Sequence, residues 1–340
     1  MKSVVYEANG PSSVLALIER DKPEPKAGEV RVRVMVSAVN PTDWKSRLGA
    51  VAGTLLPTPQ VPNQDGAGIV DALGEGVTGL AVGQRVWLWD AAFQWADGTA
   101  QEFTVLPARH VVALPDEVSF DVGATLGIPA LTAHRALTVR ESGPAQLSSG
   151  SLTGTSILIA GGAGAVSHAA IQLAVWAGAT VITTVSSEAK AALARAAGAQ
   201  HIINYRTEDV VARIRKIAPE GVPLVVEVNA TANLPLDVEV LAQGGTIAIY
   251  TSEATEHLDV PVRPSMVKNI RYQFILTYTT SIEQKDAAVA AVSEALAAGR
   301  LGVGEEFGLP LIRFDLESVA AAHDAVQNDA VGKVLIDVAQ

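Results

Sequence analysis

A glycine-rich turn stands between an apolar strand and a helix near the middle of the chain. The segment "SILIA" is followed by Gly161, Gly162 and Gly164, and a helical pattern then runs over 165–177. Such a turn directs unpaired N–H groups and the positive end of the helix dipole to one point, where a pyrophosphate can bind. Ser167 is small enough for the helix to pack on the strand. Glycine is also needed in purely structural turns, but the strand–turn–helix context favours a dinucleotide.

The next strand ends in serines where a carboxylate would select NAD. The segment "TVITTV" leads into Ser186 and Ser187, whereas an acid at this point would bind the ribose 2′-hydroxyl. Serines do not repel a 2′-phosphate, Lys190 can neutralise it, and Tyr205 can offer a hydroxyl group. Lys190 as a solvated lysine and Tyr205 as an edge aromatic are the structural alternatives, and Glu188 could still bind the ribose. Together these residues favour NADP(H).

Two kinds of secondary structure must position these groups. The segment 29–39 alternates apolar and polar residues, and further short strands follow it, which is typical of a compact antiparallel β domain. From about residue 125, continuous apolar strands alternate with helices, which indicates a parallel sheet covered on both faces. The helices are expected over 165–177, 188–198, 207–217 and 234–242. The fold class is therefore α/β, a Rossmann-type doubly wound parallel sheet plus a β domain.

The composition of the chain disfavours several classes of function. The 340 residues have enough length for two domains, and charges interrupt every apolar run before it reaches the length of a bilayer span. The net charge of −11 has no basic run, which disfavours nucleic-acid and membrane partners. The absence of cysteine and of an evident secretory signal at the N-terminus fits a cytoplasmic protein. The six histidines show no ligand-like spacing, so no metal site is predicted.

Several segments in the same order resemble one family nearly from end to end. They include "VNPTDWKSR", "VPNQDGAGIV", "GATLGIPALTAHRAL", "AGGAGAVSHAAIQLA", "ANLPLDVEVLAQGGTIAIY" and "GKVLIDV". The chain resembles the zinc-free medium-chain dehydrogenases/reductases, specifically the zeta-crystallin-like NADPH:quinone oxidoreductases. The resemblance implies a GroES-like catalytic domain in residues 1–125 and 277–340. It also implies an NADP-binding Rossmann domain in residues 126–276 and a homodimer or homotetramer.

The resemblance also assigns cofactor contacts along the chain. It places a group of residues at the pyrophosphate, a second group at the adenosine 2′-phosphate, and a third at the ribose and nicotinamide. The first group is Gly162, Ala163, Gly164, Ala165 and Val166, the second is Ser186, Ser187, Lys190 and Tyr205, and the third is Thr132, Asn233, Tyr250, Thr251, Ser252, Ile275, Leu276 and Thr277. The chain departs from the family at His134, where a tyrosine is expected, and at Tyr250-Thr251, which replaces a glycine-containing turn.

The expected chemistry is reduction of an electrophilic acceptor. The zinc-dependent relatives use a cysteine and a "GHE" histidine, whereas this chain has no cysteine and reads "NQDGAG" there. Without a zinc Lewis acid, alcohol oxidation is disfavoured. Hydride transfer to a quinone or an α,β-unsaturated ketone puts negative charge on an oxygen, which a donor would stabilise. Asn40 is the first candidate donor and Lys45 the second, while Asp43 either orients the loop or touches substrate.

Two other functions remain open at this point. A 2-enoyl thioester reductase could use the same scaffold, although the acidic chain offers little sign of the basic entrance that a long acyl carrier needs. A non-catalytic NADPH-binding protein is the second alternative. A role of such a binding protein in binding RNA is disfavoured, because the chain is acidic and has few aromatic residues for stacking on bases. A small-molecule quinone or enone is therefore the expected partner.

Overall fold

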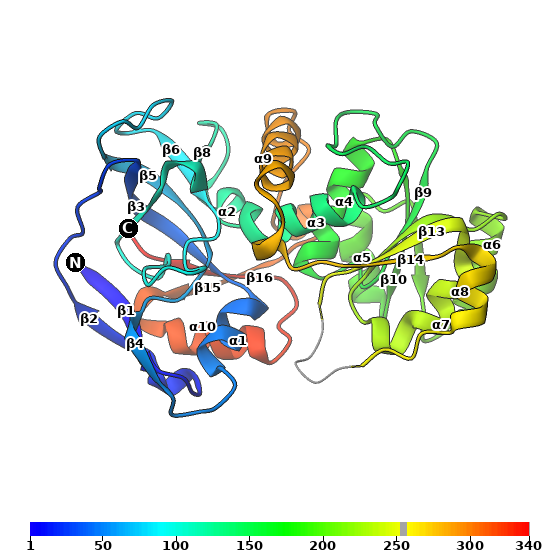
Figure 1. Ribbon diagram of the computed structural model, residues 1–340, viewed down its shortest axis with the longest axis horizontal. Helices are drawn as coiled ribbons and strands as arrows, with labels where there is room; N and C mark the ends of the chain where they lie inside the picture. The colour runs from blue at the N-terminus through cyan, green and yellow to red at the C-terminus, as the bar shows by residue number, and fades with distance from the viewer. Residues whose placement is uncertain (252–256, 340) are drawn as a thin grey trace. The chain divides into compact units, whose positions relative to one another are not determined.

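The chain folds into two compact units, which are described separately. The computed structural model describes residues 1–251 and 257–339. The first unit combines Met1–Ile128 with Pro310–Gln340, and the second is Pro129–Leu309. Figure 1 shows the elements of both units.

The second unit is built on a six-stranded parallel sheet in the order β11-β10-β9-β12-β13-β14. Numbered along the chain this order is 3-2-1-4-5-6, the arrangement of dinucleotide-binding Rossmann sheets. The strands are β9 (Ser156–Ile159), β10 (Thr180–Val185), β11 (His201–Asn204), β12 (Val222–Glu227), β13 (Leu241–Ile249) and β14 (Arg271–Phe274). The α/β prediction with a doubly wound sheet is therefore confirmed for this unit.

Helices lie on both faces of this sheet, α4 above it and α7 below it in Figure 1. Buried apolar side chains of α6 and α7 share one core cluster with five strands, β9 to β13. The helices are α3 (Leu131–Leu137), α4 (Ala165–Trp176), α5 (Glu188–Ala196), α6 (Val210–Ile217), α7 (Ala230–Val240), α8 (Val262–Lys268) and α9 (Ile282–Ala297). The helix expected over 207–217 begins later because Asp209 caps it, accepting the Ala212 N–H at 3.0 Å. The helix expected over 234–242 instead spans Ala230–Val240, since β13 starts at Leu241.

The boundary predicted at residue 276 differs from the observed division. The sheet-containing unit runs on to Leu309, so residues 277–309 belong to it and not to the β unit. The reason is packing: α9 contacts α3 and α4 of the same unit. Only the segment from Pro310 returns to the first unit.

The first unit is mainly antiparallel. One sheet has the order β15-β16-β3-β5-β6-β8 with β7 also paired to β3, and a smaller sheet has the order β2-β1-β4. The predicted alternation in β3 (Glu29–Val39) is confirmed, because Val30, Val32 and Val34 are fully buried. The other strands are β1 (Lys2–Ala8), β2 (Ala16–Glu19), β4 (Leu55–Gln60), β5 (Asp65–Leu73), β6 (Arg85–Leu88), β7 (Phe103–Pro107), β8 (Val111–Ala113), β15 (Leu311–Asp315) and β16 (Lys333–Asp337). The helices are α1 (Pro41–Leu48), α2 (Phe120–Gly123) and α10 (Val319–Gln327).

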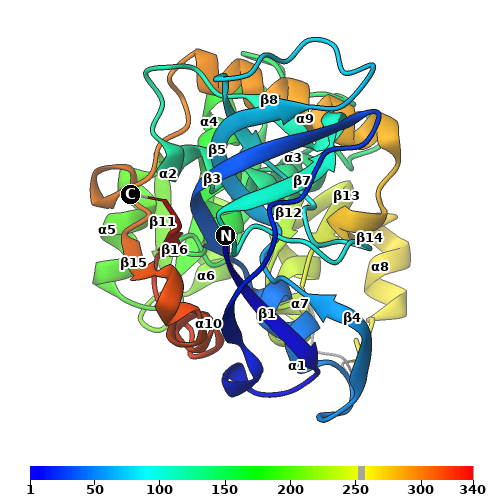
Figure 2. The same cartoon turned by 90° about the vertical axis from the view of Figure 1, so that its left-hand side faces the viewer.

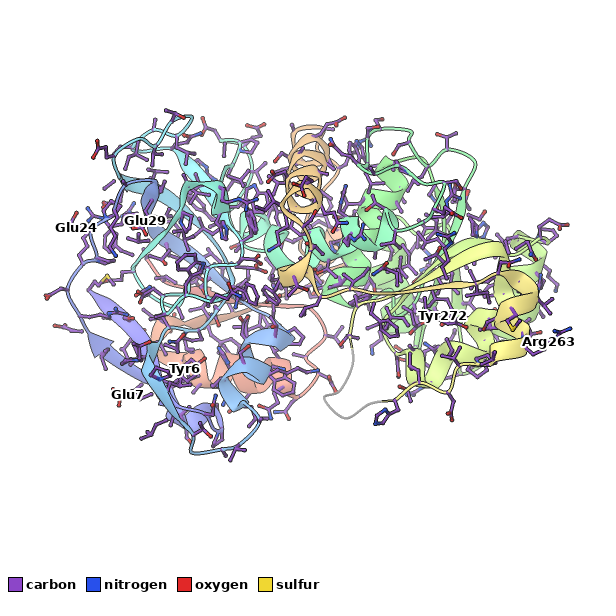
Figure 3. All side chains as sticks on the ribbon, viewed as in Figure 1. Tyr6, Glu7, Glu24, Glu29, Arg263 and Tyr272 are labelled. Atoms are coloured by element: carbon purple, nitrogen blue, oxygen red, sulfur yellow. The ribbon has the colours of Figure 1, made fainter. Side chains whose placement is uncertain are left out.

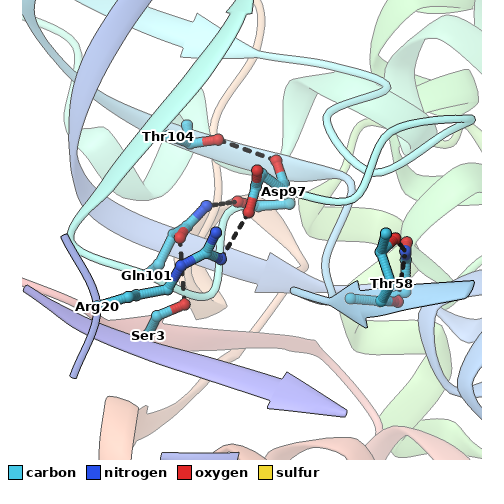
Figure 4. Close-up of polar contacts among 8 residues, drawn as sticks. Ser3, Arg20, Thr58, Asp97, Gln101 and Thr104 are labelled. Atoms are coloured by element: carbon cyan, nitrogen blue, oxygen red, sulfur yellow. Dashed lines mark hydrogen bonds and ion pairs between the residues drawn. The ribbon is translucent and has the colours of Figure 1, made fainter. Parts of the chain in front are cut away.

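Side-chain hydrogen bonds fasten the smaller sheet to the rest of the first unit (Figure 4). Ser3 on β1 donates to Gln101 at 3.1 Å, and Arg20, just after β2, pairs with Asp97 at 2.7 Å. Thr104 donates to the Asp97 carbonyl at 3.0 Å. Figure 2 shows β1 and β4 side by side in the same unit, and these two strands are hydrogen-bonded.

Candidate functional site

The residues assigned to the cofactor gather at one edge of the parallel sheet. Parallel strands end at the same edge, and each assigned group of the second unit except Thr132 follows a strand end or begins the next helix. The glycine turn follows β9, the serines follow β10, Tyr205 follows β11, and Asn233 lies in the first turn of α7 after β12. Tyr250 follows β13 and Ile275 follows β14. The sheet topology therefore brings together residues that are far apart in the sequence.

The three glycines of the turn after β9 serve different purposes. Gly161 has a φ of +65°, which favours glycine. A Cβ on Gly162 would lie 2.3 Å from Thr183 Oγ1, so Gly162 is required by packing against β10. A Cβ on Gly164 would meet nothing closer than the Gly161 carbonyl oxygen at 3.5 Å, and Gly164 is exposed. Gly164 therefore presents open backbone, which is what the close approach of a ligand requires.

Helix α4 starts directly after this open backbone. The N–H groups of Ala165 and Val166 are in its first turn and have no acceptor within the helix. Both residues are partly exposed, whereas Ala163 before them is buried. The free N–H groups and the helix dipole fit a pyrophosphate at this end of α4. The residues present therefore fit a dinucleotide.

Tyr250 lies beside the same helix end. Its hydroxyl is 3.1 Å from Ser167 Oγ, and Ser167 in turn donates to the Ala160 carbonyl at 2.8 Å. Burial raises the pKa of the Tyr250 hydroxyl, so it stays a neutral donor and acceptor. A tyrosine in place of the family's glycine-containing turn is therefore accommodated by a partner on α4.

After the end of β10, the first carboxylate in the chain belongs to Glu188 in the first turn of α5. Ser187 caps α5, because its Oγ accepts the Lys190 N–H at 3.3 Å. Glu188 is exposed and lies 3.9 Å from Arg195 on the same helix. Tyr205 is half exposed, and its N–H donates to the Val185 carbonyl at 3.1 Å, which holds the turn after β11 beside the end of β10.

The residues assigned to the ribose and nicotinamide form a second group at the same edge. Thr132 on α3 and Thr277 are buried, and their hydroxyls are 2.5 Å apart. Ile275 is buried and donates its N–H to the Ile249 carbonyl at 2.8 Å, whereas Leu276 is mostly exposed. Thr251 is partly buried, and Ser252 lies outside the described residues.

Two buried acids at this edge were missed by the sequence analysis. Glu227 ends β12 and is fully buried, and its Oε1 accepts from Asn233 Nδ2 at 3.0 Å and from the Asn229 N–H. Asp237 on α7 is also buried and interacts with Glu227. A charged residue inside the apolar run "LVVEV" was the sequence signal that could have indicated this pair.

In the first unit, Asn40 is enclosed in a buried network. Its Nδ2 donates to Asp65 at 2.8 Å, and its Oδ1 accepts from Lys333 Nζ at 2.6 Å. Its backbone N–H donates to Asp43 at 2.6 Å. Asn40 is only 3% exposed. The amide predicted to stabilise negative charge on a substrate is thus engaged by two buried side chains, both of which the sequence analysis missed.

Asp43 is likewise internal and does not face solvent. Its second oxygen accepts the Gln64 N–H at 3.1 Å, so the carboxylate ties α1 to the segment before β5. Burial raises the pKa of Asp43 to about 7 and that of Asp65 to about 6. Burial also lowers the pKa of Lys333, which the two acids oppose. Of the two alternatives for Asp43, the observed contacts are those of a residue that orients the loop.

Lys45 differs from Asn40 and Asp43 because it is partly exposed on α1. Its ammonium lies 5.6 Å from the centre of the Trp44 ring. A cation so placed can interact with a ligand without the loss of a buried network. Of the three residues predicted for catalysis, Lys45 is the one that is not buried.

Within the described ranges, no three His, Cys, Asp or Glu side chains form a group that could hold a metal ion. The same part of the chain contains no helix of the length and apolarity needed to cross a membrane.

Comparisons with known proteins agree with this architecture. Residues 26–116 match the family model "Alcohol dehydrogenase GroES-like domain", and residues 165–294 match "Zinc-binding dehydrogenase". The chain therefore belongs to the medium-chain dehydrogenase/reductase superfamily, with a GroES-like N-terminal domain and a Rossmann-type sheet. Within that superfamily it is quinone oxidoreductase-like over its full length.

Individual relatives support both statements. The human quinone oxidoreductase is 27% identical over 337 residues, which cover 98% of this chain and 96% of the human protein. A crystal structure titled NAD-dependent alcohol dehydrogenase superposes with a TM-score of 0.85 at 26% identity and covers all of both chains. A mycobacterial protein solved with NADPH has a TM-score of 0.80 at 25% identity and covers 99% of both chains. The chain is thus a relative of NAD(P)-dependent oxidoreductases.

Proposed function

We propose that this protein is a zinc-independent oxidoreductase that transfers hydride from NADPH to a quinone or an α,β-unsaturated carbonyl compound. The observation that carries the proposal is the open backbone at Gly164 and the first turn of α4, together with the start of α5, where Ser187 and not a carboxylate is the capping residue. The likeness to quinone oxidoreductases, the human protein among them, supports the acceptor class.

The choice of NADP(H) rests on the end of β10. The relatives include a protein titled NAD-dependent and one solved with NADPH, so the family likeness alone does not select the cofactor. Glu188 lies 3.9 Å from Arg195 on the same helix, and Ser187 is the residue that caps α5 after the end of β10. Ser186, Lys190 and Tyr205 then form a neutral-to-positive surface that suits a 2′-phosphate.

When bound, the reduced nicotinamide supplies a hydride, which carries two electrons to the acceptor. Negative charge then forms on an oxygen of the quinone or enone, and Lys45 is our candidate to stabilise it. Asn40 and Asp43 hold the backbone that precedes and begins α1 and thus fix where Lys45 stands. Zinc ligation by cysteine is not available to this chain, since it contains none.

A turnover screen tests the acceptor class. Oxidation of NADPH is followed with 1,4-benzoquinone, 9,10-phenanthrenequinone, small enones and 2-enoyl thioesters. We expect turnover with quinones or enones and none with primary alcohols and NADP⁺. Preference for enoyl thioesters would replace the proposal with a thioester reductase. Tight NADPH binding without any turnover would indicate a binding protein.

Lys190→Ala tests the cofactor choice. Loss of a charge-assisted phosphate contact costs about 1.5–3 kcal/mol, so we expect the Kd for NADPH to rise roughly 10- to 100-fold. The Kd for NADH should stay unchanged, because NADH lacks the 2′-phosphate. Titration by fluorescence measures both constants. Lys216→Ala removes an exposed lysine of α6 in the same unit and serves as the control. Equal losses for NADPH and NADH would show that Lys190 has only a structural role.

We also propose that the protein assembles as a homodimer or homotetramer through the β14 edge of the parallel sheet. In the described part of the sheet β14 pairs with β13 alone, so its other side has open hydrogen-bonding groups. Phe274 is 62% exposed, and on α8 Met266 and Val262 are 63% and 65% exposed. Tyr272 on β14 donates to or accepts from Ser265 on α8 at 2.6 Å, which holds the two elements together; Figure 3 labels Tyr272 and Arg263 of α8.

A further inference from the structure

Two carboxyl groups are buried together at the cofactor edge of the sheet. Glu227 is the last residue of β12 and Asp237 lies in α7, and their exposed fractions are 0% and 1%. Strand β12 runs parallel to β9, with Val226 opposite Ile159. The chain just after Glu227 therefore lies beside the glycine turn, and a Cβ on Gly161 would be 3.0 Å from Val228.

The hydrogen-bond donors near this pair are insufficient for two carboxylates. Glu227 Oε1 accepts from the Asn229 N–H and from Asn233 Nδ2. Among the described residues, no N–H or O–H donor is in hydrogen-bonding geometry with Glu227 Oε2 or with either oxygen of Asp237, although the Val228 N–H also lies near the Glu227 carboxyl group. Nevertheless the two side chains are within hydrogen-bonding reach of each other. Two carboxylates offer only acceptors, so a hydrogen bond between them requires a proton.

Within residues 1–251 and 257–339, no nearby cation replaces that proton. Of the elements packed on α7, the described part of β13 has no charged side chain and β12 has only Glu227. On α6, Arg213 pairs with Glu208, Arg215 donates to backbone carbonyls, and Lys216 is exposed. Lys268 of α8 donates to three backbone carbonyls at the end of α7, and Glu239 is exposed.

Electrostatics agrees with the count of donors. Burial, and after it the negative charge of Glu227, raise the pKa of Asp237 to about 9. Burial also raises the pKa of Glu227, and its hydrogen bonds with Asn229, Asn233, Asp237 and the Val228 N–H oppose this rise. Of the two acids, Asp237 is therefore the one that holds the proton. Tyr250 is the other titratable group that Glu227 influences, and its pKa is raised as well.

We propose that Asp237 is protonated at neutral pH and donates to Glu227, and that Glu227 thereby holds the Asn233 amide in place at the cofactor edge. Asp237 is then a positioning residue, which acts on the cofactor through Glu227 and Asn233. The part of this inference that concerns the cofactor rests on the proposed function. The protonated pair itself does not depend on it.

The inference predicts a specific loss at alkaline pH. When Asp237 loses its proton, two negative charges share one buried site and the bond that holds Glu227 is lost. Asn233 is released, and the affinity for NADPH falls. The folded pKa of Asp237 lies above its ordinary value. The stability from the bound proton is therefore complete below about pH 4 and is lost progressively as the pH rises through about 9.

Asp237→Asn is the variant that distinguishes a hydrogen bond that depends on a titrating proton from one that does not. An asparagine amide donates to Glu227 at every pH. We expect its Kd for NADPH at pH 7 to be within threefold of the wild-type value. Between pH 8 and 10 the wild-type Kd should rise at least tenfold more than that of Asp237→Asn. Asp237→Leu cannot donate and should show the weakened affinity already at pH 7. Glu239→Gln, on the exposed side of α7, is the control.

Two further measurements keep the outcomes distinct. The infrared difference spectrum of wild-type protein minus Asp237→Asn should show a protonated carboxyl band at pH 7 that disappears at alkaline pH, because the subtraction removes the contributions of Asp43 and Asp65. Urea unfolding should show wild-type stability falling with pH relative to Asp237→Asn, whether or not NADPH binds. Identical pH profiles, or stabilisation of only the wild type by Mg²⁺, Ca²⁺ or Zn²⁺, would overturn the inference. Failure of NADPH to bind at pH 7 would instead overturn the proposed function.

Discussion

Three buried histidines make the stability of this fold depend on pH. His134 accepts the Leu147 N–H at 3.2 Å, His168 is 2.8 Å from the Phe307 carbonyl, and His323 is 3.0 Å from Asn63. Burial lowers their pKa values to about 4 for His134 and His168 and to about 3 for His323. All three are therefore neutral at physiological pH. The histidine that replaces the family's tyrosine at 134 is thus a core residue with a backbone partner.

These depressed pKa values predict acid lability. A histidine with an ordinary pKa of 6.5 in the unfolded chain stabilises the fold above pH 6.5, and that stability is lost as the pH falls toward the folded pKa. Asp43 and Asp65 act in the opposite direction, so the test compares variants. His323→Gln should lose less stability than the wild type between pH 7 and pH 5, by about 2 kcal/mol. Urea unfolding measures the difference, and the exposed His257→Gln is the control. The same acid loss in His323→Gln and wild type would contradict this assignment.

At the scale of elements, two glycines of the turn between β9 and α4 have different roles, Gly162 in packing and Gly164 in the proposed binding of phosphate. Gly162→Ala places a methyl group 2.3 Å from Thr183 Oγ1. Because such overpacking typically costs about 1–3 kcal/mol, urea unfolding should show that the free energy of unfolding falls by about this amount. Gly164→Ala meets no close atom, so its stability should stay within about 1 kcal/mol of the wild type. Its Kd for NADPH should nevertheless rise at least tenfold in a fluorescence titration. Unchanged binding by Gly164→Ala would show that no phosphate approaches this backbone.

The elements also show what the sequence could and could not predict. The strand–turn–helix around Gly161 and the buried face of β3 follow from local spacing, and both were predicted from it. The network around Asn40 was not, because Lys333 is 293 positions away and reaches it only through the pairing of β16 with β3. The pairing of Glu227 with Asp237 likewise depends on how α7 packs back on β12. Contacts set by packing between distant segments leave little trace in one sequence.

At the scale of the whole molecule, the open edge β14 leads to a test of assembly. Light scattering should give a mass that is twice or four times the 35.3 kDa of one chain. Phe274→Lys together with Met266→Asp puts charges on the exposed apolar surface and should yield monomers that still bind NADPH. Val82→Asp, a change at another exposed valine, is the control and should leave the mass unchanged. A wild-type monomer, or a charged variant that stays assembled, would contradict the proposed interface.

The strand β16 has a consequence for how the protein is made. It is an interior strand of the larger sheet of the first unit, between the edge strand β15 and β3, and its Lys333 donates to the buried amide of Asn40. During translation the parallel-sheet unit can be completed while the amino-terminal strands still lack this central neighbour. At ordinary rates of ribosomal elongation, the synthesis of the chain between the amino-terminal strands and β16 takes roughly 10 to 40 seconds. Until β16 emerges, the nascent β domain therefore lacks the strand that pairs with β3 on this side of the sheet.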